Sequence, residues 1–207
     1  MINDLRTLPP QYACVPDIIY WFTAITGAFL HADFWHLAGN MLFIWVFGDN
    51  VEDAMGHFKF AIFYLLCAFA GSWFHAYSFP SSDAALIGAS GAAAGIIAAY
   101  LMLHPKMWVW ILFASRIPLR LPAWAVLGFW LGLQVWMYVA SEGSQISWAA
   151  HVGGALAGFV LTPVLKRWAV PLFDREVVVP GAVVLNDDAE LPPKVEPPRW
   201  GRGAAKA

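Results

Sequence analysis

The chain has 207 residues, of which 60% are hydrophobic and 13% charged, and it contains 12 Trp and 15 Phe. This composition is far more apolar and aromatic than that of an ordinary soluble domain, so it excludes that class and indicates a membrane protein. The net charge of -2 comes with no basic stripe, so we expect no nucleic-acid partner, and two cysteines, Cys14 and Cys67, are too few for a disulfide framework.

Residues 1–33 form the first segment. It contains an uncharged run of 13 residues, Ile18 to Leu30, whereas a bilayer core needs about 20 apolar residues. Because the run is short and rich in aromatic side chains, we expect an interfacial segment that lies along the outer membrane surface. No basic region followed by an apolar run and a cleavage site is present, so we expect no signal peptide.

Five largely uncharged stretches follow, and together they predict an all-α fold, a polytopic membrane helix bundle with five spans. We expect the first span to end in a charged turn, residues 48–53, and residues 107–121 to form a connection along the membrane. Residues 34–168 would be the transmembrane domain, and residues 169–207 a cytoplasmic, Pro-rich, largely disordered tail. The predicted spans cover residues 34–47, 58–77, 90–104, 122–140 and 147–165.

Basic residues alternate between the connections. One connection contains Lys59, another contains Lys106, Arg116 and Arg120, and the last span is followed by Lys166 and Arg167, whereas the connections between these carry no Lys or Arg. The positive-inside rule therefore puts the basic loops and the C-terminal tail in the cytoplasm, and the polar loops outside.

Three spans that run from outside to inside carry polar residues at one depth. Ser90 lies 14 residues before His104, His151 lies 15 before Lys166, and His36 lies 13 before Asp49. At about 1.5 Å per residue these separations are all roughly 20 Å. Polar groups at such a depth are costly unless they face a bundle interior or a wet cavity, so we expect them to be functional.

Small residues predict how these groups meet. Gly91 and Gly95, and likewise Gly154 and Gly158, place glycine on one face of each helix, which allows two backbones to approach closely. If these two faces oppose each other, Ser90 and His151, which lie just outward of them, come together. The same spacing at Gly128 and Gly132 predicts a further packing face.

Such a meeting predicts nucleophilic catalysis. His151 could take the hydroxyl proton of Ser90, and no carboxylate lies at a matching depth, so we expect a dyad. The available donors to an oxyanion are the Ser90 backbone N–H, the Asn40 amide and the His36 ring, the last two four residues apart on one helix face. Each patch alone is also compatible with plain helix packing or interhelical hydrogen bonding.

The order of three motifs resembles the rhomboid family of intramembrane serine proteases. The motifs are His-x-x-x-Asn beginning at His36, Gly-x-Ser-Gly around Ser90, and Ala-His-x-Gly-Gly-x-x-x-Gly around His151, in three alternate spans. The match includes residues 47–53 and covers roughly residues 21–165.

This resemblance implies that Ser90 is the nucleophile, His151 the general base, and His36, Asn40 and the Ser90 amide the oxyanion donors. It also implies transmembrane protein substrates cut near their outer ends, with no metal or other cofactor, and a lateral gate that involves residues 124–136. The common family core has six spans, and here the first is lacking, so we expect either a five-span form or a true start further upstream. The expected location is a bacterial inner membrane.

Two alternatives stay open. An inactive rhomboid-like protein would bind membrane clients, although such forms typically lose the nucleophile or the base, and this chain keeps both. A metal transporter could use His36, His75 and His151 as ligands, since imidazole suits zinc, copper and nickel, but this leaves Ser90 unexplained.

Overall fold

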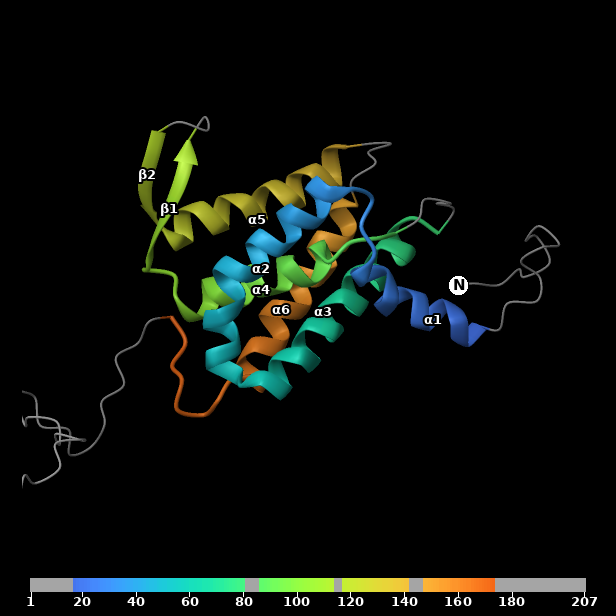
Figure 1. Ribbon diagram of the computed structural model, residues 1–207, viewed down its shortest axis with the longest axis horizontal. Coiled ribbons are helices and arrows are strands. Elements are labelled where there is room, and N and C mark those ends of the chain that lie inside the picture. The colour runs from blue at the N-terminus through green and yellow to red at the C-terminus, as the bar shows by residue number, and fades with distance from the viewer. Residues whose placement is uncertain (1–16, 81–85, 114–116, 142–146, 174–207) are drawn as a thin grey trace, which may run out of the picture. The chain divides into compact units, whose positions relative to one another are not determined.

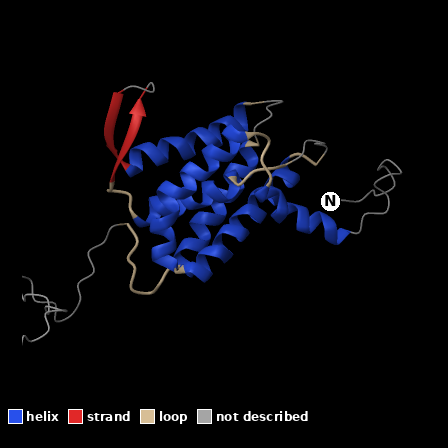
Figure 2. Cartoon of the chain, in the orientation of Figure 1, coloured by secondary structure: helices blue, strands red, loops and turns tan. Residues whose placement is uncertain are grey.

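Helices make up most of the described chain (Figures 1 and 2). The computed structural model describes residues 17–80, 86–113, 117–141 and 147–173, all in one compact unit. The helices are α1 Asp17–Thr26, the short 3-10 helix η1 Gly27–Phe29, α2 Phe34–Met55, α3 His57–Ser78, α4 Ser90–Leu103, α5 Ala123–Ala140 and α6 Trp148–Leu165. The predicted helical membrane bundle is confirmed.

Helix α2 is longer than predicted. It begins where the side chain of Asp33 accepts hydrogen bonds from the backbone N–H groups of Trp35 and His36, at 2.7 and 2.9 Å. The predicted charged turn after residue 47 is wrong, because the helix continues to Met55. Val51, Ala54 and Met55 form a buried stripe on this last part while the acidic residues point outward, so packing holds it helical. It ends at Gly56, whose φ of +89° favours glycine.

Three of the five predicted spans are long and apolar enough to cross a membrane within the described residues, namely α3, α5 and α6. Helix α4 is apolar but has only 14 residues. It is nonetheless the most enclosed element, since 11 of its residues are buried and it contacts α2, α3, α5 and α6. Helix α4 is therefore the centre of the bundle (Figure 1).

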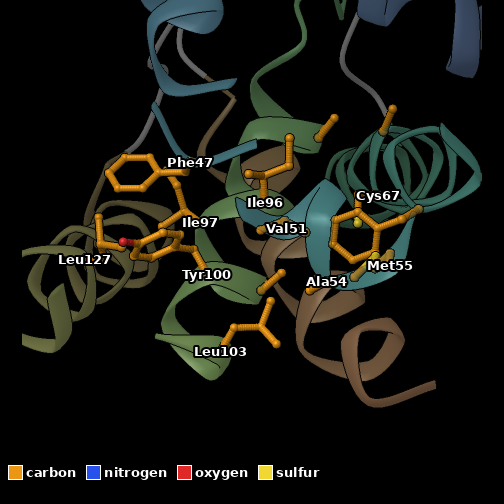
Figure 3. Close-up of a cluster of buried hydrophobic side chains, with 14 of the residues drawn as sticks. Phe47, Val51, Ala54, Met55, Cys67, Ile96, Ile97, Tyr100, Leu103 and Leu127 are labelled. Atoms are coloured by element: carbon orange, nitrogen blue, oxygen red, sulfur yellow. The ribbon is translucent and has the colours of Figure 1, made fainter. Parts of the chain in front are cut away.

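Buried side chains of α2, α3, α4 and α5 together form the main hydrophobic core. Figure 3 shows Phe47 of α2 close to Ile97 and Tyr100 of α4, and Leu127 of α5 on the same side. The rings of Phe47 and Tyr100 meet edge to face with centroids 5.0 Å apart. Cys67 of α3 is fully buried and is a packing residue here.

The connection between α4 and α5 is a β-hairpin, which the sequence analysis did not predict. Strands β1, Trp108–Phe113, and β2, Ile117–Pro122, pair antiparallel, with Trp110 opposite Arg120. Aromatic and β-branched residues favour strands, and the prolines of β2 disfavour a helix. Figure 2 shows the two strands extending beyond the helices at one end of α5.

Two other predictions are changed or left open. Gly128 and Gly132 were expected to pack, but a Cβ at either position would meet no described atom within 4 Å, so that prediction is wrong for this part of the chain. Most of the predicted tail, residues 174–207, and residues 1–16 lie outside the described residues. The described start of the tail returns to the bundle, where the backbone N–H of Phe173 donates to the carbonyl of Met102 at 2.7 Å.

Candidate active site

A cavity of about 990 Å³ lies between the helices that carry the predicted site residues. Its lining includes Ser90, His151, His36 and Asn40, which come from α4, α6 and α2. Both Ser90 and His151 are partly exposed to it rather than fully buried. The volume is within the range of sites that hold small ligands or short segments of a larger one.

Helices α4 and α6 touch through their backbones at the level of Ser90 and His151. A Cβ added at Gly154 would lie 1.9 Å from the carbonyl oxygen of Gly91. One helical turn further along, a Cβ at Gly158 would lie 2.4 Å from the carbonyl oxygen of Gly95. No side chain other than hydrogen fits at these contacts, so glycine permits the close approach of the two helices.

The residues that flank the two candidate catalytic side chains are neighbours as well. A Cβ at Gly91, directly after Ser90, would lie 3.3 Å from the carbonyl oxygen of Ala150, directly before His151. Ser90 is the first residue of α4, and Ser147 caps α6 by accepting from the backbone N–H of Ala150 at 3.2 Å. The starts of α4 and α6 therefore meet at the cavity.

Gly88 brings α2 into the same site. Its φ of +114° is one that side chains with a Cβ rarely adopt, and a Cβ there would lie 2.6 Å from Cε1 and 2.7 Å from Nε2 of His36. The Asn40 amide nitrogen would be 3.5 Å from the same point. His36 and Asn40 therefore lie against the loop that leads into Ser90.

Two of these side chains carry hydrogen-bond donors suited to a bound anion. Asn40 is 7% exposed, and its Nδ2 is buried with no hydrogen-bond partner among the described residues. Leaving such a donor unpaired costs about 1–3 kcal/mol, which a bound water or substrate oxygen could recover. His36 accepts at Nδ1 from the backbone N–H of Ala32 at 3.4 Å, so a neutral ring carries its proton on Nε2.

His151 has a neighbour that the sequence analysis missed. The Oε1 atom of Gln134, on α5, lies 2.7 Å from Nδ1 of His151, and Gln134 is only 3% exposed. Trp130 stacks near the imidazole with centroids 6.2 Å apart, and Trp148 meets it edge to face at 5.8 Å. No carboxylate was expected at this depth, and the sequence signal for this partner is a lone amide side chain inside an apolar span.

His75, the third ligand of the metal alternative, has a structural contact. Its Nδ1 lies 2.6 Å from Oγ of Ser147, so it supports the cap at the start of α6. Within the part of the chain that the structure describes, no group of three or more His, Cys, Asp or Glu side chains could hold a metal ion.

Comparison with known proteins gives one consistent family. A family model described as the Rhomboid domain matches residues 20–168. Rhomboid protein 1, mitochondrial, of Saccharomyces cerevisiae is 31% identical over 155 residues, which cover 70% of this chain and 41% of that protein. Rhomboid-like protein 11, chloroplastic, of Arabidopsis thaliana is 27% identical over 162 residues, covering 76% of this chain and 57% of that protein.

A bacterial relative carries an enzyme name. Rhomboid protease GluP of Bacillus subtilis is 30% identical over 139 residues, covering 67% of this chain and 25% of that protein. This chain thus spans less than two thirds of the length of each of these three relatives. They carry mitochondrial, chloroplastic and bacterial designations, so they give the expected bacterial inner membrane no particular support.

Proposed function

Because this chain belongs to the rhomboid family, we propose that it is an intramembrane serine endopeptidase in which Ser90 and His151 form a catalytic dyad. One observation carries this proposal: the α4 and α6 backbones touch beside Ser90 and His151, and both side chains line one cavity. The protease name of the Bacillus subtilis relative adds support. The catalytic domain would correspond to residues 34–168.

In the first half-reaction, Nε2 of His151 removes the hydroxyl proton of Ser90 as Oγ attacks the scissile carbonyl carbon. The tetrahedral intermediate then collapses, the C–N bond breaks, and the imidazolium returns the proton to the leaving amine. The acyl group stays on Ser90 as an ester. In the second half-reaction, a water molecule loses a proton to His151 and attacks that ester, which frees the acid product and restores the hydroxyl.

Three donors would hold the oxyanion of the intermediate. The buried Nδ2 of Asn40 has no partner among the described residues, and the Nε2 proton of His36 lies beside Gly88. The backbone N–H of Ser90 belongs to a helix N-terminus that no described side chain caps. Such fixed donors act most strongly away from bulk water, where removal of one typically reduces kcat about 10²–10³-fold.

The substrates would be transmembrane segments of other membrane proteins, cut near their outer ends. A peptide bond reaches the Ser90 hydroxyl only as extended or unwound chain, because helical carbonyls are already hydrogen-bonded. The orientation that follows from the basic residues, with Lys59 in the first turn of α3 and Lys106 after α4 on the cytoplasmic side, would open the cavity to the opposite side.

Labelling with a fluorophosphonate probe tests this function. The probe reacts with an activated serine hydroxyl and loses fluoride, so labelling reports the dyad without knowledge of a natural substrate. We expect wild-type protein in membranes to be labelled, and Ser90→Ala and His151→Ala to lose labelling while they remain folded by size-exclusion chromatography. A folded wild type that is not labelled, and that binds a transmembrane helix without cutting it, would indicate the client-binding alternative instead.

A further inference from the structure

On the basis of the serine-protease function proposed above, we propose that Gln134 is a positioning residue. It would hold the His151 ring by its Nδ1–H group, so that Nε2 is unprotonated and free to act as the base toward Ser90. In a Ser-His-Asp triad a carboxylate has this task. Here an uncharged carboxamide on a different helix, α5, would perform it.

The hydrogen bonds fix which way the Gln134 carboxamide faces. Its Nε2 donates to the backbone carbonyl oxygen of Trp130 at 3.1 Å, and a carbonyl can only accept. The amide oxygen is therefore on the other side, 2.7 Å from Nδ1 of His151. An amide oxygen also can only accept, so Nδ1 must carry the hydrogen. In a neutral imidazole this leaves Nε2 as the atom that accepts a proton.

Burial makes this contact strong. Gln134 is the buried polar residue of α5, an otherwise apolar helix with exposed Trp124, Phe129 and Trp136. An unpaired amide in such a place is costly, and both ends of this one are satisfied by the bonds to Trp130 and His151. The stacked ring of Trp130 further limits rotation of the imidazole.

The lack of charge on the Gln134 side chain also has a consequence for catalysis. Its oxygen accepts from Nδ1–H in both the neutral and the protonated imidazole, so it holds the ring through the whole catalytic cycle. A matched substitution exists, because Gln134→Glu keeps an acceptor opposite His151 whether the new carboxyl is ionised or protonated. Gln134→Met keeps a similar unbranched shape and removes the acceptor.

The test compares these variants in labelling rate and in cleavage of a transmembrane substrate. For Gln134→Met we expect a fall of about 10–100-fold in labelling rate and kcat with KM within about twofold, and for Gln134→Glu a rate within about threefold of wild type. Leu156→Met, the same new side chain at a more exposed position of α6 that does not line the cavity, is the control and should keep the wild-type rate.

The possible results separate a positioning role of Gln134 from a packing role, and both from a failure of the dyad. Wild-type rates in folded Gln134→Met, or a Gln134→Glu variant as slow as Gln134→Met, would overturn the positioning role and leave Gln134 as a packing residue. If Gln134→Met fails to fold, ¹⁵N NMR of histidine-labelled wild-type protein, assigned with His151→Ala, decides instead: a protonated Nδ1 is expected, and an unprotonated one overturns the proposal. A wild type whose labelling does not need Ser90 would instead refute the dyad itself.

Discussion

The substitution Gly154→Ala is expected to push α4 and α6 apart at the active site. A Cβ there would lie 1.9 Å from the carbonyl oxygen of Gly91, whereas real Cβ atoms essentially never come closer than 3.0 Å to such an atom, a shortfall of 1.1 Å. The obstacle is backbone and cannot rotate aside, so the helices themselves must move. Because Gly91 directly follows Ser90, that movement also displaces Ser90 relative to His151.

Both stability and activity should fall. Inserting a methyl group into a tightly packed contact typically costs about 1–3 kcal/mol. For a chain of this size each kcal/mol corresponds to about 2–4 °C in Tm, so a decrease of about 2–12 °C is expected. A misplacement of about 1 Å can reduce a rate about 100-fold, so labelling should fall by more than the folded fraction does.

The measurements are thermal unfolding in detergent and the rate of fluorophosphonate labelling. Gly128→Ala on α5 is the matched control, because a Cβ at Gly128 meets no described atom within 4 Å. Alanine also favours a helix over glycine by about 1 kcal/mol, so the control should keep or raise Tm. A Gly154→Ala variant with the Tm and the rate of wild type would refute the proposed backbone contact.

Three further outcomes are expected. Asn40→Ala should reduce substrate cleavage about 10²–10³-fold with little change in Tm, because its Nδ2 has no partner among the described residues; an unchanged kcat would remove Asn40 from the oxyanion site. Ser147→Ala removes the α6 cap and the contact to His75, so Tm in a thermal scan should decrease by an amount equivalent to about 1 kcal/mol, and an unaltered Tm would contradict that role. Treatment with EDTA should leave labelling and cleavage unchanged, and a loss restored by added zinc would favour the metal alternative.

The membrane class and the helical fold could be predicted from the sequence, because both depend on local composition. Long uncharged stretches are costly in water and can cross a bilayer only as helices, so their positions follow from residue order alone. The candidate catalytic residues could also be predicted, from the order of the motifs along the chain and from the depth of their polar side chains in the predicted spans. In the structure Ser90, His151, His36 and Asn40 all line one cavity. Their chemical roles remain proposals.

Other features were decided only by tertiary packing. The last turns of α2 contain acidic residues that suggested a turn, yet the buried stripe of Val51, Ala54 and Met55 keeps them helical. The hairpin β1–β2 depends on pairing between residues on two strands, and the strand-favouring residues in 107–121 do not by themselves specify that pairing.

The contact between Gln134 and His151 shows the same limit at the site itself. The two residues belong to different helices, α5 and α6, and nothing in the order of residues along the chain indicates that these two side chains meet. Sequence order reveals which polar groups lie within the bilayer, because each costs free energy there. Only the packing of α5 against α6 determines which of them satisfy one another, since hydrogen bonds require atoms to come within about 3 Å.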